Sequence, residues 1–502
     1  MKHKTTRSPD RRLPFGLVPL LMISLLVASP RAQDPARVHG KLPKTLEIAD
    51  VMVVRGDGAP PFGPTSVYVS DGKIVDSLAD KAEVVIDGKG KWLLPGLVAT
   101  HAHLQEESAG IPMPMEYQTD LWTACGITTV RDLGSTLSRS LRVRARADKG
   151  EIAAPHILLY HQFGTVNSPA DARARVRALE EAGADGIKFW SNLNYPPEIL
   201  RAALDEAKNV GLRSTAHIGV GECNAIHYAQ YGITSIEHWY GIPDAALRGV
   251  QDFPAKFSYS NEVDRFREAG KLWRQTDPQK LESVLQYLVD HNVGWSPTFA
   301  VYEASRDLVR AQNQPWFRDW LHPALEAFFS PNLTSHGSYF IGWLSTDEAN
   351  WRENYRIWMQ AVRRFEELGG VVTTGEDAGY IYLLYGFGLL RELELHEEAG
   401  FHPLEVIRHA TYNGAKVMGM EDRFGRVLPG LDADLIVVNG NPLENLKRLY
   451  PTGCDEYVDG KPAPTGGVLW TIRGGRIWHG PTLATAIKDI VRQAREKAIP
   501  KR

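Results

Sequence analysis

The feature that most constrains the fold is a regular alternation of short apolar segments and amphipathic segments between about residue 95 and residue 377. The apolar segments have the length of buried strands, and the segments between them, such as 170–182 and 197–210, carry Ala, Leu, Glu and Arg at helical spacing. The predicted strands are 96–103, 127–133, 156–160, 186–190, 213–217, 235–239, 294–299 and 371–377. This succession, without a glycine-rich nucleotide-binding turn, predicts an α/β fold built on a (β/α)8 TIM barrel.

The two flanks of this region have a different pattern. Residues 45–91 and 425–480 are rich in short β-type runs separated by Gly and Pro, and neither flank is long enough to fold well alone. We therefore expect one small β-sandwich domain assembled from both ends of the chain. The barrel would then occupy residues 92–424, including an insertion at 301–370, and residues 481–502 would form a C-terminal tail.

The N-terminus resembles a secretory signal peptide over residues 1–32. Five Lys and Arg residues precede an apolar run at 15–28, which is shorter than the roughly 20 residues that a membrane-spanning helix needs. The pair Arg11-Arg12 also suits twin-arginine export, and an uncleaved membrane anchor is the alternative interpretation. We expect an exported protein, periplasmic or secreted, without a stable membrane span after processing.

The charge balance and the cysteine count exclude several classes of protein. The chain has 57 Lys and Arg against 60 Asp and Glu, and the body of the chain contains no basic block, so nucleic-acid binding has no electrostatic support. Three scattered cysteines are too few for a disulfide framework or a cysteine-based zinc site. We expect a small-molecule or peptide substrate and a homo-oligomeric protein.

Ligand-type residues recur at the ends of the predicted strands. In a barrel of this class the chemistry lies at the C-terminal ends of the strands. His101 and His103 end the first strand with a spacing of two, which directs both imidazoles to the same side. The later strands carry Lys188, His217, His238 and Asp377. A single His-x-His pair would be weak support, but this ordered recurrence predicts a site for zinc, manganese, cobalt or iron.

The same segments resemble the metal-dependent amidohydrolase superfamily. The matching motifs are Leu-Pro-Gly-Leu-Val-Ala-Thr-His-Ala-His-Leu at 94–104, Gly-Ile-Thr-Thr-Val-Arg-Asp-Leu-Gly at 126–134, Gly-Ala-Asp-Gly-Ile-Lys at 183–188, Ser-Ile-Glu-His at 235–238 and Gly-Glu-Asp-Ala-Gly at 375–379. Segments 410–415 and 430–442 resemble the closing helix and a sandwich strand of the imidazolonepropionase-like branch, which includes bacterial prolidases and Xaa-amino-acid carboxypeptidases. The resemblance covers roughly residues 45–480.

The resemblance implies a binuclear metal centre. One divalent ion, zinc by preference, would be held by His101, His103 and Asp377, and a second by His217 and His238. Lys188 would bridge the two ions after carboxylation by CO2, because an ammonium group cannot ligate a cation.

The implied reaction is hydrolysis of an amide or peptide bond in a dipeptide or an N-acyl amino acid. A hydroxide bridging the two metals would attack the carbonyl carbon. Asp377 would act as general base and then as general acid toward the leaving amine.

Two departures from the family pattern and one insertion bear on the site. Glu376 stands where the family often has Thr, and its side chain should alternate away from Asp377 toward the helices. Segment 214–219 lacks a neighbouring histidine that the family often has before His217. The insertion 301–370 contains five of the 13 tryptophans and predicts either an aromatic lid or ordinary helical packing. We expect Tyr240 and His161 to contact the substrate.

Three alternatives remain open at this point. A mononuclear enzyme of the imidazolonepropionase or deaminase type would not need a bridging lysine, so Lys188 favours the binuclear hypothesis. Lactone and phosphotriester hydrolases use the same two-metal machinery and are separated only weakly by sequence. A non-catalytic scaffold is the remaining alternative, although all the ligand positions are filled.

Overall fold

The computed structural model describes residues 35–190, 195–250, 252–333 and 335–498. The predicted signal peptide at 1–32 lies outside the described residues. Within the described ranges, none of the helices combines the length and the apolar character needed to cross a bilayer.

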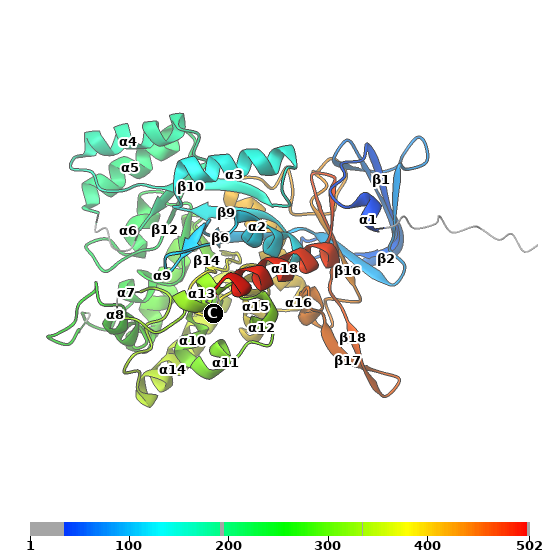
Figure 1. The fold of residues 1–502 in the computed structure, drawn as a ribbon. Helices are drawn as coiled ribbons and strands as arrows, with labels where there is room; N and C mark the ends of the chain where they lie inside the picture. Colours follow the sequence, from blue (N-terminus) through cyan, green and yellow to red (C-terminus); the bar gives the residue numbers. More distant parts are fainter. Residues whose placement is uncertain (1–34, 191–194, 251, 334, 499–502) are drawn as a thin grey trace, which may run out of the picture. The chain divides into compact units, whose positions relative to one another are not determined.

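A parallel sheet of eight strands contains all the strands predicted for the barrel (Figure 1). In spatial order they are β15 (Val371–Val372), β14 (Gly294–Ser296), β13 (Ser235–Glu237), β12 (Arg213–Ala216), β11 (Gly186–Phe189), β10 (His156–Gln162), β9 (Ile127–Leu133) and β6 (Leu97–Ala102). Most of the strands end earlier than predicted, because their last residues leave the ladder to form the loops that carry polar side chains.

The sheet is curled, so that the chain beyond its last strand lies against its first strand. The Thr373 amide donates to the Trp295 carbonyl at 2.9 Å, on the β14 side. The Thr100 amide of β6 donates to the Thr374 carbonyl at 2.9 Å, and the Glu376 amide donates to the His101 carbonyl at 3.1 Å. Backbone bonds therefore connect the chain after β15 to both β14 and β6.

Amphipathic helices connect the strands, and their ends follow local sequence rules. α4 (Pro169–Glu181) begins with Ser168, whose hydroxyl accepts the Asp171 amide, and with proline at its first position. α9 (Pro278–Asp290) begins in the same way with Asp277. The other long connecting helices are α2 (Met115–Ala124), α3 (Leu137–Lys149), α5 (Pro197–Asn209) and α15 (Phe387–Glu398). The short ones are α6 (Ala225–Gln230), α7 (Ile242–Ala245), α8 (Glu262–Ala269), α16 (Pro403–Arg408) and α17 (Gly414–Met418).

Strands from both ends of the chain share a second, mostly antiparallel sheet. The path is β20 (Arg476–His479), β19 (Val468–Arg473), β16 (Leu435–Asn439), β5 (Lys91–Pro95), β1 (Thr45–Val53), β2 (Phe62–Ser70) and β3 (Lys73–Val75), and β4 (Val84–Asp87) pairs with β1. β16 pairs directly with β5, so the two flanks of the sequence are joined by backbone hydrogen bonds. One apolar cluster contains fully buried residues from both flanks, namely Leu46, Leu93, Leu435 and Ile472. Each flank therefore needs the other to bury its apolar side chains.

The insertion 301–370 is helical, and its most deeply buried tryptophans serve as core residues. It contains most of α10 (Phe299–Arg306), then α11 (Leu308–Gln312), α12 (Phe317–Trp320), α13 (Pro323–Phe328) and α14 (Ser345–Glu367). Trp351 and Trp358 on α14 are fully buried, and Trp320 is 3% exposed. For these three side chains the structure favours helical packing over a lid.

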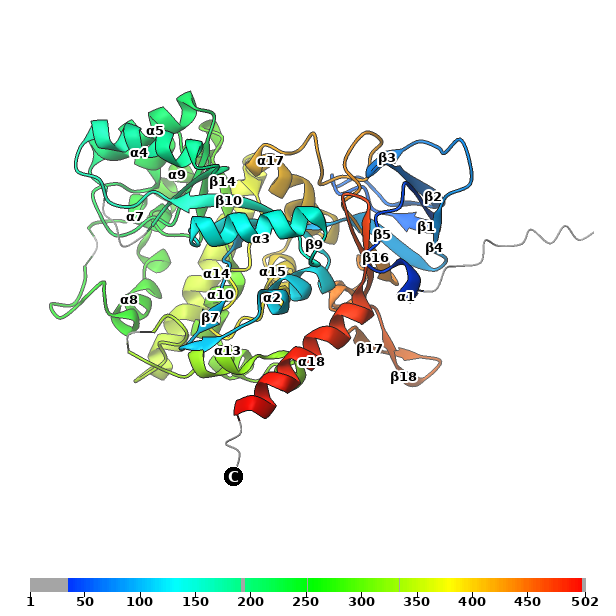
Figure 2. The same cartoon turned by 45° about the horizontal axis from the view of Figure 1, so that its top comes forward.

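The C-terminal tail is one helix, α18 (Gly480–Ala498), which docks through an apolar stripe. Leu483, Ile487 and Val491, spaced by four residues, are buried. Figure 2 shows α18 beside α2, with which it has direct contacts. The Arg495 guanidinium also donates to the Arg318 carbonyl at 2.7 Å, so the tail is fastened to the insertion.

Replacing Ile487 with Ala should lower the free energy of unfolding by about 2–5 kcal/mol, because it leaves a cavity at a fully buried position. Thermal denaturation followed by circular dichroism measures the effect. The exposed neighbour Gln493→Ala is the matched control and should change stability by less than about 0.5 kcal/mol. Equal melting temperatures for the two variants would contradict the docking of α18.

Candidate metal centre

The structure brings all six predicted ligand residues to one cavity. The cavity has a volume of about 320 Å³, and its polar end is formed by His101, His103, Lys188, His217, His238 and Asp377. These residues lie in or just beyond β6, β11, β12, β13 and β15, at the ends where each strand leaves the sheet. The side chains come from five separate strands, and the curl of the sheet makes them converge.

Asp377 lies at the centre of the histidines. Its Oδ1 is 3.2 Å from His103 Nε2 and 3.5 Å from His101 Nε2, and its Oδ2 is 3.8 Å from His238 Nε2. One potential ligand atom each from His101, His238 and Asp377 lie within 4.8 Å of one another. The His217 ring follows, with its centroid 4.4 Å from that of His238. His238 therefore lies next to members of both predicted ligand groups, Asp377 and His217.

Two buried atoms of the six predicted ligands have no hydrogen-bond partner among the described residues. They are Lys188 Nζ and His217 Nε2. An unpaired ammonium in a protein interior is costly, so such a position is stable when the group is neutral or when it binds a ligand. Burial lowers the pKa of Lys188 to about 8. The orphaned atoms, together with three further imidazoles and one carboxylate, fit a site for divalent cations.

Burial also sets the protonation of the histidines. It lowers the pKa of His101, and it places the pKa values of His217 and His238 well below the ordinary value. Neutral imidazole is the form that binds a metal. Burial by itself would raise the pKa of Asp377, but the facing His101 and His103 outweigh it and hold that pKa well below its usual range.

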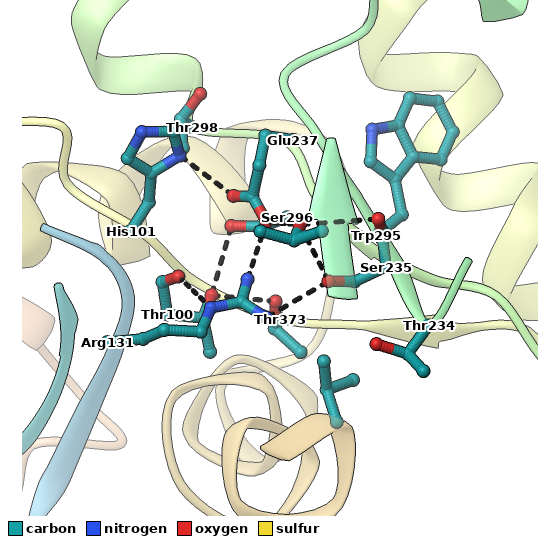
Figure 3. Close-up of polar contacts among 12 residues, drawn as sticks. Thr100, His101, Arg131, Thr234, Ser235, Glu237, Trp295, Ser296, Thr298 and Thr373 are labelled. Carbon is teal, nitrogen blue, oxygen red and sulfur yellow. Dashed lines mark hydrogen bonds and ion pairs between the residues drawn. The ribbon is translucent and has the colours of Figure 1, made fainter. Parts of the chain in front are cut away.

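A buried network of polar side chains contacts the predicted ligands on the side away from the cavity (Figure 3). Glu237 Oε2 is 2.8 Å from His101 Nδ1, and Glu237 Oε1 accepts from Arg131 Nη2 at 2.5 Å. Both charged side chains are fully buried. Burial would raise the pKa of Glu237, but Arg131 and His101 reverse this effect and lower it. On the other side, His238 Nδ1 is 2.5 Å from Thr298 Oγ1.

Two of the predicted ligands and the threonine that contacts one of them adopt left-handed backbone conformations that non-glycine residues rarely use. They are His238, Thr298 and Asp377, with φ of 60°, 51° and 47°. Each such residue costs roughly 1–3 kcal/mol and persists only where its surroundings hold it. The amides of His238 and Asp377 donate to the carbonyls of Ser296 and His101, which holds these conformations.

The remaining wall of the cavity is mainly aromatic and apolar. It is formed by Trp190, Phe266, Val301, Tyr302, Tyr380 and Ile381. The wall also contains a charged cluster around Glu262. Arg265 Nη2 donates to Glu262 Oε2 at 2.7 Å, and His336 Nδ1 lies 3.1 Å from the same oxygen. The insertion 301–370 thus contributes to the wall, although its tryptophans are not among the lining residues.

The two predicted substrate contacts lie outside this lining. The Tyr240 ring stacks on His217 with a centroid distance of 4.7 Å and is 4% exposed, so it supports a ligand from behind. His161 is partly exposed at the end of β10, and its Nδ1 is buried without a partner. Glu376 faces away from the cavity as predicted, since its carboxylate accepts from Trp122 Nε1 and from the Gly386 amide.

Sequence reasoning assigned no role to Glu237, Arg131 or Thr298. The first two carried a usable signal, because each is a charged residue inside a segment predicted to be a buried strand, and such residues need a partner. Glu237 also directly precedes the predicted ligand His238. Thr298 had no comparable signal, since a threonine at the end of a strand is common.

Sequence and structure comparisons relate this chain to known proteins. Residues 358–462 match the profile of the Amidohydrolase family. A dihydropyrimidinase from Arabidopsis thaliana is 22% identical over 447 residues, which are 83% of this chain and 80% of the relative. A solved Xaa-Pro dipeptidase with methionine bound in its active site is 19% identical and has a TM-score of 0.60, over 87% of this chain and 100% of that chain. A prolidase complexed with N-methylphosphonate-L-proline is 18% identical, with a TM-score of 0.57 over 87% and 99%.

The metal-free protein should lose stability as the pH falls below about 6.5. The pKa values of His101, His217 and His238 are lowered in the folded state, so the unfolded chain binds more protons at acidic pH. The three neutral histidines contribute fully to the free energy of unfolding above pH 6.5, which is about the pKa of histidine in the unfolded chain. As the pH falls from there toward the lower pKa of the folded state, each histidine removes up to about 1.4 kcal/mol of this free energy per pH unit. Melting temperatures between pH 8 and pH 5 measure the slope.

His217→Asn should reduce this slope, because it removes one of the three groups. His291→Asn, at an exposed position on the end of α9, is the matched control and should keep the wild-type slope. Equal slopes for wild type and His217→Asn would contradict the neutral burial of His217.

Proposed function

We propose that the chain uses two divalent metal ions to cleave a dipeptide or an N-acyl amino acid. The proposal starts from its membership of the metal-dependent amidohydrolase superfamily, as a hydrolase of amide carbon–nitrogen bonds. The observation that carries the proposal is the convergence of six ligand-type side chains on one cavity. Two of them, Lys188 and His217, present buried atoms without partners. We also infer that the bonds between β6 and the chain after β15 close the curled sheet into the predicted barrel.

His101, His103 and Asp377 would hold one ion, and His217 and His238 the other, with zinc preferred and manganese, cobalt or iron as alternatives. Lys188 would join the two sites after its neutral amine attacks CO2. A nitrogen–carbon bond forms, one proton leaves the nitrogen, and the product is an anionic carbamate with two oxygen ligands. The lowered pKa of Lys188, caused mainly by burial, supports this step because it increases the fraction of neutral amine.

Bound in this way, the ions would supply the Lewis acidity that activates water for attack at neutral pH. Asp377 provides the proton transfer. Its carboxylate is kept ionised by His101 and His103, so it can accept a proton from the attacking water. It then delivers that proton to the amide nitrogen as the carbon–nitrogen bond breaks. The left-handed backbone of Asp377 holds the carboxylate among the histidines for both steps.

The wall of the cavity supports the substrate class. Its aromatic and apolar side chains suit an uncharged side chain or acyl group. The structures with a similar fold include one with methionine bound and one with a proline phosphonate bound. Both ligands are built on an amino acid, which supports a dipeptide or an N-acyl amino acid. Export, suggested by residues 1–32, and homo-oligomerisation belong to the same proposal.

Protein purified without chelators should contain about two divalent ions per chain, measured by plasma mass spectrometry. It should hydrolyse members of a panel of dipeptides and N-acetyl amino acids, and chelation should abolish this activity. One ion per chain would favour a mononuclear mechanism. Failure to retain any ion after reconstitution with zinc and bicarbonate would contradict the metallohydrolase proposal. Ring opening of dihydrouracil without cleavage of linear amides would contradict the substrate class.

Lys188→Ala should lower kcat/KM by about 100-fold or more, because losing a residue that only supports a metal ligand already costs about 10–100-fold and Lys188 would be a direct ligand. Millimolar acetate or propionate should restore part of the activity, because a small carboxylate can enter the space left by the side chain and bind both ions. Lys208→Ala, at an exposed position on α5, is the matched control. Full activity of Lys188→Ala without added carboxylate would contradict the bridging role.

A further inference from the structure

Glu237 receives hydrogen bonds from three side chains of the barrel interior. Figure 3 labels two of them, His101 and Arg131. Its Oε2 faces His101 Nδ1 at 2.8 Å. Its Oε1 accepts from Arg131 Nη2 at 2.5 Å and also from the Thr215 hydroxyl. Since no part of the Glu237 side chain is exposed, water does not substitute for any of these partners.

The orientation of Arg131 is determined by two further bonds. Its Nε donates to the Thr100 carbonyl at 2.6 Å, and its Nη1 donates to Ser235 Oγ at 3.0 Å. A guanidinium is always a donor, so the partner atom on Glu237 must be an acceptor. Arg131 therefore fixes the orientation of Glu237, and its buried positive charge, 2.5 Å away, favours the ionised carboxylate.

An ionised carboxylate accepts at both oxygens, and this determines which nitrogen of His101 carries hydrogen. Nδ1 must be protonated in order to donate to Glu237 Oε2. The lone pair of the neutral ring is then on Nε2, which lies 3.5 Å from Asp377 Oδ1 in the cavity. This is the nitrogen that can bind a metal.

The same logic applies to His238 through a different residue. The Thr298 hydroxyl donates its single hydrogen to the Pro297 carbonyl at 2.6 Å. It can therefore only accept from His238 Nδ1, 2.5 Å away. The lone pair of His238 is thus also on Nε2, toward Asp377.

We propose that the buried Arg131–Glu237 pair is a positioning device that fixes the tautomer of His101 and thereby sets the affinity of the site for metal. Glu237 and Arg131 act through His101 and do not touch the reacting atoms. The part of this inference that concerns affinity rests on the proposed function, because it assumes that the cavity binds divalent ions.

Glu237→Gln tests the proposal with almost no change of shape. The new amide has one oxygen, and Arg131 and Thr215, both donors, require it at the Oε1 position. The amide NH2 must then face His101 Nδ1 and demands the lone pair there. The ring hydrogen moves to Nε2, where it blocks the metal-binding nitrogen. Zinc binding, measured by calorimetric competition, should weaken about 10–100-fold.

Arg131→Met combined with Glu237→Gln should partly restore zinc affinity. Without the guanidinium, the Thr215 hydroxyl can turn its hydrogen to the Ser235 carbonyl, 3.2 Å away, and the amide can rotate and present its oxygen to His101 Nδ1. We expect the double variant to bind zinc at least about threefold more tightly than Glu237→Gln alone. Two independent losses would instead add, so that the double variant would bind zinc more weakly than either single variant. A purely structural role predicts the reverse, because the second buried substitution would add damage.

Glu303→Gln is the matched control. Glu303 is also a buried glutamate paired with arginine, accepting from Arg391 Nη2 at 2.6 Å, but it has no contact with a proposed ligand. It should change zinc affinity by less than about twofold. Unchanged affinity in Glu237→Gln, or a double variant weaker than the single one, would overturn the proposal.

Nitrogen NMR of histidine-labelled, metal-free protein provides a readout that does not depend on metal. The His101 signal, assigned by its loss in His101→Ala, should show a protonated Nδ1 in the wild type and a protonated Nε2 in Glu237→Gln. The same tautomer in both proteins would overturn the inference. A wild type that binds no zinc would contradict the proposed function, while the NMR result would still decide the role of Glu237.

Discussion

The site depends on the hydrogen bonds that join the end of the last strand to the end of the first. The amides of Glu376 and Asp377 both donate to the His101 carbonyl at 3.1 Å. These two bonds bring together residues that are far apart in the chain, and they place the Asp377 carboxylate against the imidazoles at the end of β6. The left-handed φ of Asp377 is the local cost of this arrangement.

Burial then gives the assembled groups their chemical state. Removed from water, the histidines favour the neutral form, and the lysine tends to lose its charge. The permanent positive charge of the buried Arg131 is neutralised by Glu237 rather than by Asp377. Asp377 is therefore left free to face the cavity.

The core elements of the fold were predictable because each depends on local pattern. The strands of the parallel sheet have the apolar runs that buried parallel strands require, and the helices have cap residues such as Ser168 and Asp277. The strand ends were less predictable. Val371–Val372 is far shorter than the predicted 371–377, since residues 373–376 form bonds to both neighbouring strands and to α15 instead of one regular ladder.

The candidate ligands could also be predicted, whereas their grouping and their supports could not. His101, Lys188 and Asp377 stand at strand ends, where the direction of a parallel strand makes their convergence a matter of topology. The position of His238 close to Asp377 depends on backbone strain, and the stacking of Tyr240 on His217 depends on how the loop after β13 packs. Neither leaves a periodic signal in the sequence.

By itself, the sequence determined the order of strands and helices, the two-ended origin of the antiparallel sheet and the identity of the ligand-type residues. These properties follow from hydrophobic periodicity and from chemistry that is local to each segment. Only the tertiary structure decided which ligand atoms face one another, which of them are left without partners, and which nitrogen of each histidine points into the cavity. Those outcomes depend on hydrogen bonds between residues that are distant in the chain, such as Arg131, Glu237 and His101, and directional contacts of this kind exist only once the sheet has curled.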